Sequence, residues 1–202
     1  MKRLIIAAIF CMAPLLAFGD QATGKSKDNV KKNMLLEAFG NYQFTSFDAG
    51  SIDTGSGHGM DTGLRVFPKN GRWGVGFRLG RFSHDVRYDH PLPIEGPDAI
   101  SVDGNGWTAA GDIYLRSRRK HVQPYVFFGL GAISEDHTYH FQSGNTLPKQ
   151  VRTAAVDLGC GLRIAVANRW FITPEVRVLF GLPEVNYAAQ QFGIGITYVI
   201  RK

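Results

Sequence analysis

Two short stretches of the chain combine His, Ser and acidic residues, the side chains from which hydrolytic sites are built. Residues 135–143 read Glu-Asp-His-Thr-Tyr-His-Phe-Gln-Ser, and residues 83–85 read Ser-His-Asp. A Ser nucleophile needs a base within hydrogen-bond reach. Both stretches lie where an expected strand passes into a loop, and loops favour Ser, Asp and other polar residues in any case. Because neither motif has a geometric context that implies catalysis, we predict no catalytic residues and no enzymatic activity.

The histidines also raise the question of a metal site. His137 and His140, together with Glu135 or Asp136, offer the nitrogen and oxygen ligands that zinc accepts. The spacing of three suits a helix, whereas a strand places residues i and i+3 on opposite faces. Five of the six histidines lie in expected loops: His58, His84, His90, His137 and His140. The pattern therefore predicts scattered loop histidines, with no metal site and no cofactor.

The elements that must position these residues are strands. Eight segments alternate apolar and polar side chains with a period of two: residues 36–45, 60–66, 73–80, 108–116, 125–133, 156–164, 172–180 and 191–200. The fifth is apolar on both faces, so its phase is undetermined. Eight strands of about 9–11 residues suit a barrel that spans a bilayer at a tilt.

The connections between these segments alternate in length. The short connections are residues 68–72, 117–123 and 166–169, and the long ones are 46–59, 83–106, 135–150 and 181–189. Short turns on one side and long loops on the other indicate an up-and-down outer-membrane barrel, with short turns in the periplasm and long loops outside. An even number of strands then places both termini in the periplasm.

Alternation does not by itself say which face is inside, because a soluble lipocalin-like barrel buries its apolar residues. The polar face carries five acids and five arginines: Glu37, Asp61, Asp112, Asp157, Glu175, Arg65, Arg78, Arg116, Arg163 and Arg177. An enclosed lumen strongly disfavours unpaired charge. The planar guanidinium of Arg suits bidentate pairing, and no Lys is present in the set. We therefore predict an ion-pair network in the lumen and lipid on the apolar face.

Aromatic residues and the last segment favour the same orientation. Expected strand ends beside short turns carry Phe67, Trp73, Tyr125, Trp170, Phe171 and Tyr198. Expected ends near long loops carry Phe44, Phe82, Trp107, Phe180 and Phe192. Two aromatic belts are expected of a membrane barrel. Gln191, Gly193, Ile196 and Tyr198 resemble the C-terminal signal by which outer-membrane barrels are recognised for insertion.

With these residues, the chain resembles the small outer-membrane β-barrel family of OmpA/OmpX type. The most family-like pieces are residues 123–131, 157–163 and 170–177. The resemblance implies an all-β, eight-stranded antiparallel up-and-down transmembrane barrel in the outer membrane. It also implies contact with outer-membrane lipid and lipopolysaccharide, and with the barrel assembly machinery during insertion. Pro174 cannot donate to a strand ladder, and we expect a bulge there.

The N-terminus predicts export. Lys2 and Arg3 precede the apolar residues 4–18, and cleavage is expected after Gly19. We expect three parts: a signal peptide over 1–19, a flexible periplasmic leader over 20–33 and an outer-membrane barrel over 34–202. Removal of residues 1–19 takes Lys2 and Arg3 from a chain with a formal net charge of +6, and the remaining positive charge is too small to imply a nucleic-acid partner.

An eight-stranded barrel has an interior just wide enough to be filled by side chains. The sequence therefore predicts a structural or surface-interaction role, with a filled polar lumen and no catalysis. Three alternatives remain open: a lipid A-modifying enzyme of deacylase or acyltransferase type, a soluble lipocalin-like binding barrel and a narrow channel. The loops show no composition that indicates a class of external ligand.

Overall fold

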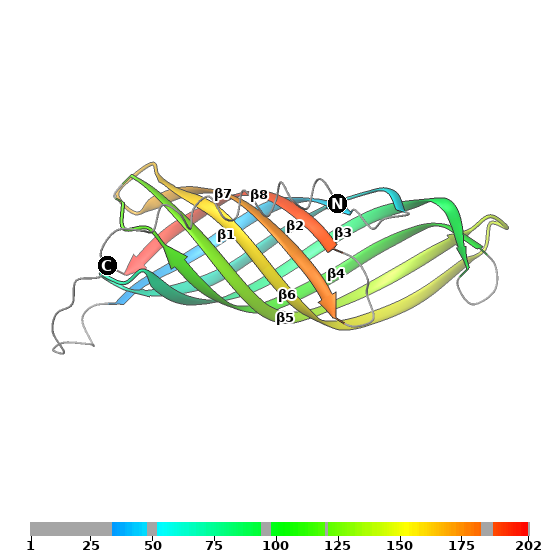
Figure 1. The fold of residues 1–202 in the computed structure, drawn as a ribbon, viewed down its shortest axis with the longest axis horizontal. Coiled ribbons are helices and arrows are strands. Elements are labelled where there is room, and N and C mark those ends of the chain that lie inside the picture. The colour runs from blue at the N-terminus through cyan, green and yellow to red at the C-terminus, as the bar shows by residue number, and fades with distance from the viewer. Residues whose placement is uncertain (1–33, 48–51, 94–97, 120, 183–187, 202) are drawn as a thin grey trace.

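A computed structural model describes residues 34–47, 52–93, 98–119, 121–182 and 188–201. These residues form eight strands that follow one another around a closed ring (Figure 1). The strands are β1 (Met34–Phe47), β2 (Ile52–Pro68), β3 (Trp73–Pro93), β4 (Asp98–Arg116), β5 (Val122–Phe141), β6 (Thr146–Ala165), β7 (Trp170–Leu182) and β8 (Ala188–Arg201). Among the described residues, no helix has the length and hydropathy needed to cross a bilayer.

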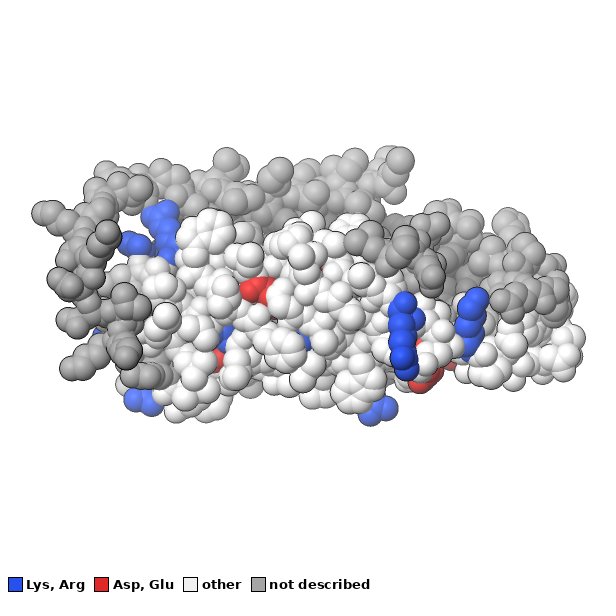
Figure 2. Space-filling model, turned by 90° about the horizontal axis from the view of Figure 1, so that it is seen from below, with Lys and Arg blue, Asp and Glu red and all other residues white. Residues whose placement is uncertain are grey.

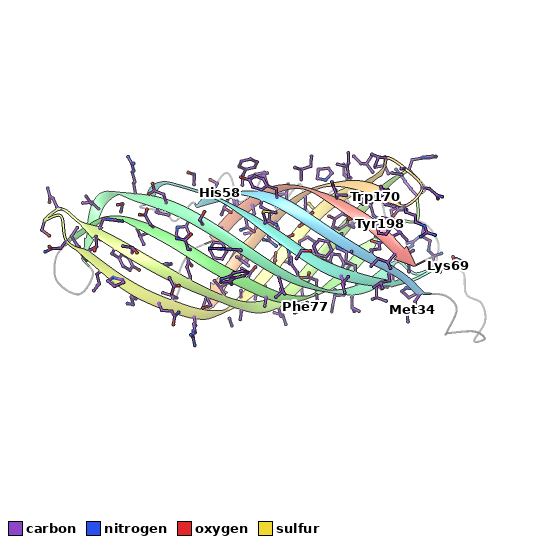
Figure 3. All side chains as sticks on the ribbon, turned by 180° about the vertical axis from the view of Figure 1, so that it is seen from behind. Met34, His58, Lys69, Phe77, Trp170 and Tyr198 are labelled. Atoms are coloured by element: carbon purple, nitrogen blue, oxygen red, sulfur yellow. The ribbon has the colours of Figure 1, made fainter. Side chains whose placement is uncertain are left out.

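The ring closes through the pairing of the first strand with the last. β1 pairs with β8 over a register that includes Ala38 opposite Tyr198 and Phe44 opposite Phe192, and every neighbouring pair is antiparallel. The prediction of an all-β, eight-stranded antiparallel barrel is confirmed. β1 begins and β8 ends at the same end of the barrel (Figure 1), which is the end where Figure 3 places Met34 and Lys69.

The two faces of the wall differ in polarity. Large apolar side chains on the outer face are exposed, among them Leu64, Phe77, Ile113 and Leu130. Figure 2 shows a mostly uncharged middle on one face of the molecule, with Lys and Arg toward its ends. The ten charged residues of the polar face are each 6% exposed or less. This distribution is the reverse of a lipocalin-like barrel, which buries apolar residues inside and exposes its charges.

The strands are longer than the alternation predicts. β3 to β6 have 21, 19, 20 and 20 residues, so much of the expected loops 83–106 and 135–150 is strand. At one end these four strands extend past β7 and β8, whose ladder spans 170–180 and 188–198 (Figure 1). Beyond the apolar band the outer face of these strands meets water, so apolar residues are no longer selected on that face. The alternation therefore disappears although the hydrogen bonds continue.

Two local expectations are settled by strand register. The phase of the fifth segment places Tyr125, Phe127 and Ile133 inside, each 3% exposed or less. The bulge expected at Pro174 is wrong, because β7 keeps one register with β8 through Pro174 and Ile194. The pairing with β6 is interrupted instead, between Gly161 and Ile164. Proline has no backbone N–H to donate, so it removes hydrogen bonds between strands without shifting their register.

A charge placed on the apolar face tests this orientation. Leu130 on β5 is 59% exposed. Leu130→Arg should destabilise the barrel by ~2–4 kcal/mol in urea unfolding from lipid vesicles, because Arg is costly near the bilayer midplane. Thr138→Arg is the control. It lies on the outer face of the same strand beyond the apolar band and should change stability by less than ~0.5 kcal/mol. Equal tolerance of both variants would contradict the membrane-facing assignment.

Candidate functional site: the barrel interior

Two arginines hold the middle of the interior together. Arg78 of β3 reaches Asp112 of β4 at 2.8 Å and Asp157 of β6 at 2.5 Å. Arg177 of β7 lies 3.1 Å from Asp61 of β2 and 3.5 Å from Asp157. Arg177 also donates to Gln43 Oε1 at 2.5 Å. In the ring β3 and β6, like β7 and β2, are three strands apart, so the Arg78–Asp157 and Arg177–Asp61 contacts cross the interior.

Two further groups lie closer to the short-turn end. Glu37 of β1 accepts from Arg116 at 3.2 Å and from Arg163 at 2.7 Å, so one carboxylate serves two guanidinium groups. Arg65 lies 3.5 Å from Glu175, which also accepts a hydrogen bond of 2.6 Å from Tyr125. All ten charged residues singled out in the sequence thus have an oppositely charged neighbour inside the barrel.

Aromatic rings cover several of these guanidinium groups. Arg116 lies 3.8 Å from the ring centre of Phe67, and Arg163 lies 3.5 Å from that of Phe171. Arg65 lies 3.9 Å from the ring centre of Phe39. Such contacts stabilise a desolvated cation by about 2 kcal/mol or more. A guanidinium binds acids with the N–H groups at its edge, which leaves its flat face for a ring.

This arrangement corrects the expected aromatic belts. Trp73, Trp170, Phe44, Trp107 and Phe192 are exposed on the outer wall, and the Trp170 and Tyr198 rings are in contact at 4.6 Å (Figure 3). Four rings that were expected in the belts are buried in the interior: Phe67, Tyr125, Phe171 and Phe82. Position along a strand does not decide which face a side chain is on. Each of these four rings lies an even number of residues from an inward charge on its own strand, so it also points inward.

The wall needs small residues where these side chains meet. A Cβ built on Gly129 of β5 would lie 2.3 Å from Asp112 Oδ1. Gly129 stands between Asp112 on β4 and Asp157 on β6, the two acids that Arg78 bridges. A side chain at this position would push that carboxylate away from its partner.

The four residues of the expected insertion signal divide between the two faces of β8. Gln191 is buried, donates to Thr45 Oγ1 at 3.1 Å and accepts from Arg177. Gly193 faces the Gln43 side chain. Ile196 is 56% exposed on the outer wall, and Tyr198 contacts Trp170 there. In the folded barrel, Gln191 therefore belongs to the Arg177 group.

A second polar group lies in the interior beyond the outer end of the apolar band. His84 of β3 contacts Glu135 Oε1 of β5, and His137 Nε2 lies 3.0 Å from the same oxygen. Burial raises the pKa of Glu135, but hydrogen bonds with His137 and His84 lower it to about 2. Glu135 is therefore ionised at neutral pH. All three residues belong to the two sequence motifs, but the sequence did not predict that His84 lies beside Glu135 and His137.

The strands place the residues within each of the two sequence motifs, 83–85 and 135–143, on different faces of the wall. His84 points inward, whereas Ser83 and Asp85 on either side of it belong to the outer face. His140 lies outside, 2.9 Å from Asp103, so it shares no site with His137. Ser83 Oγ instead lies 3.3 Å from His58 Nε2 on the outer face. Neither motif forms a triad within itself, because neighbours along a strand point to opposite sides of the wall.

A closed barrel with an apolar outer wall and a charge-paired interior defines the class of outer-membrane β-barrels. The chain belongs to the family described as the outer membrane protein beta-barrel domain, which matches residues 8–199. The protein is therefore an outer-membrane protein. No curated protein of similar sequence was found.

Solved structures resemble the fold at low sequence identity. Ail, the attachment invasion locus protein of Yersinia pestis, is 11% identical, and the match covers 83% of this chain and 99% of Ail, with a TM-score of 0.56. Neisserial surface protein A is 8% identical, and the match covers 81% of this chain and 96% of that chain, with a TM-score of 0.52. These likenesses concern the fold alone.

The interior network can be tested at Arg78. Arg78→Gln leaves Asp112 and Asp157 without their shared cation, so the barrel should lose ~3–5 kcal/mol of stability in urea unfolding from vesicles. Arg87→Gln on the exposed face of the same strand is the control and should stay within ~0.5 kcal/mol of the wild type. A small and equal effect of both substitutions would show that the interior charges are not coupled.

Proposed function

We propose that the protein is a structural or surface-interaction barrel of the outer membrane, with an interior closed by side chains and no catalysis. The observation that carries this proposal is the pair of arginines, Arg78 and Arg177, which bind acids of β2, β4 and β6 inside the ring. An open pore would leave these charges to water, whereas here each is buried between partners.

The proposed topology follows from strand length. The short turns, with both termini, lie in the periplasm, and the extended ends of β3 to β6 lie outside the cell. Residues 1–19 act as a signal peptide and residues 20–33 as a periplasmic leader. The outer wall contacts membrane lipid and lipopolysaccharide, and the assembly machinery recognises Gln191, Gly193, Ile196 and Tyr198 on insertion.

The surface-interaction part of the proposal rests on the extension of β3 to β6. Its outer face carries charges of both signs, including Asp85, Arg87, Asp103, Asp136 and Arg152, all of them exposed. A rigid sheet presents such groups in a fixed spacing, which a mobile loop does not. Ail has been solved in complex with a heparin analogue, sucrose octasulfate. On this chain the mixed charge favours a partner with both acidic and basic groups.

A lipid A-modifying activity is the second candidate, and the Ser83–His58 contact is the observation in its favour. In the described part of the chain, no acid lies within hydrogen-bond distance of His58 to orient it as a base. Lipid A from cells with and without the protein should therefore give identical mass spectra. A mass change that disappears in Ser83→Ala would replace the structural role by catalysis.

Conductance tests the closed interior. In planar bilayers the wild-type protein should give no stepwise current, because the interior is filled. The double variant Arg78→Ala, Arg177→Ala removes the two cations at the middle of the interior and should give small steps. Arg87→Ala, at an exposed position outside the interior, should remain silent. Stepwise conductance of the wild type would contradict the proposal and identify a narrow channel.

A further inference from the structure

Three side chains from two strands converge on one point in the interior. His84 and His137 both contact Oε1 of Glu135. One donor atom from each residue lies within 4.8 Å of the other two. Two imidazole nitrogens and one carboxylate oxygen form a set of ligands that first-row transition metals accept. At this separation, small rotations of the side chains bring all three donors to a shared ion.

The strand between them is shaped for this approach. His84 on β3 pairs with Gly104 on β4, and Gly104 pairs with His137 on β5. A Cβ built on Gly104 would lie 2.1 Å from His84 Nε2 and 2.5 Å from Glu135 Oε1. The missing side chain on β4 is thus what lets a residue of β3 meet residues of β5.

A further contact orients one of the ligands. Tyr139 Oη lies 3.2 Å from Nδ1 of His137. If a metal ion replaces the Nε2 proton that faces Glu135, Nδ1–H donates to the Tyr139 oxygen and the lone pair on Nε2 binds the ion. Metal-binding histidines are held in this way by an acceptor at their second nitrogen.

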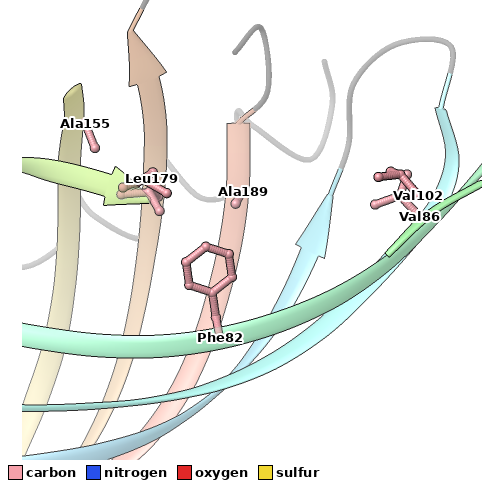
Figure 4. Close-up of a cluster of buried hydrophobic side chains, with 7 residues drawn as sticks. Phe82, Val86, Val102, Ala155, Leu179 and Ala189 are labelled. Carbon is pink, nitrogen blue, oxygen red and sulfur yellow. The ribbon is translucent and has the colours of Figure 1, made fainter. Parts of the chain in front are cut away.

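The surroundings of the three residues are apolar. Phe82, Val86, Val102, Ile133 and Leu179 belong to one cluster of buried side chains in this part of the barrel (Figure 4). The ring of His84 stacks on that of Phe82, with centroids 6.2 Å apart. Glu135 is 1% exposed in this apolar layer, where an ionised carboxylate is costly unless a cation neutralises it. A divalent cation offsets that charge.

We propose that His84, Glu135 and His137 bind a divalent transition-metal ion, with zinc as the reference ion. The ion has three protein ligands and an open position, and it ties β3 to β5 across β4 at the extended end of the barrel. The residues His84 and His137 are 8% and 9% exposed, whereas Glu135 is 1% exposed. A small ion therefore approaches from the histidine side.

The test uses the full chain, folded in detergent, purified without a His tag and stripped with a chelator. Zn²⁺ titration should show one ion per barrel, and Zn²⁺ should raise the temperature at which the barrel loses its unheated gel mobility. His84→Ala, Glu135→Gln and His137→Ala should each weaken Zn²⁺ binding by more than the ~10–100-fold expected when only an orienting group such as Tyr139 is lost.

His140→Ala is the matched control, since His140 is three residues from His137 and lies on the outer face. It should bind Zn²⁺ like the wild type. A folded barrel that binds no Zn²⁺, or one that loses binding equally in His140→Ala and His84→Ala, would overturn the proposal.

If the site variants do not fold, an experiment on the wild type alone decides the question. Zn²⁺ should protect His84 and His137, but not His140, from diethyl pyrocarbonate, and equal modification of all three would overturn the site.

Discussion

The hydrogen bonds between β1 and β8 are the contacts on which the rest of the molecule depends. A bilayer offers no partner for a peptide N–H or C=O, so a sheet can cross it only when its first and last strands pair. In this chain the pairing runs from Leu36 to Phe47 on β1. Closure with eight strands leaves an interior that side chains just fill. Inward side chains of the described strands therefore meet residues from the opposite wall, as Arg78 meets Asp157.

That narrow interior explains the choice of its side chains. A buried charge without a partner is strongly destabilising, and each of the five acids and five arginines has a partner of opposite charge inside the ring. Arginine suits this role because its edge binds carboxylates while its face lies on a ring, as Arg65 does on Phe39. Glycine on the wall, as at Gly129, gives these long side chains room.

Beyond the outer edge of the bilayer the constraint changes. β3 to β6 continue as paired strands, but water can reach their outer face, and polar residues such as Asp103 and His140 take the place of Leu and Ile there. The inner face stays buried and largely apolar, with His84, Glu135 and His137 as its polar group. Rigid strands, rather than loops, thus hold these three side chains at a common point.

The alternation of the sequence determined the number of strands and the ten inward charges. It also determined which face points inward in seven of the eight strands, because side-chain direction in a strand follows a period of two. It did not determine which acid meets which arginine, or that His84 meets Glu135 and His137. Residues 51 positions apart become neighbours only through the registers of β3 with β4 and of β4 with β5. Those registers arise from packing inside the closed ring. The local sequence pattern does not determine these registers, because the alternation within one strand is the same however far that strand is shifted along its neighbour.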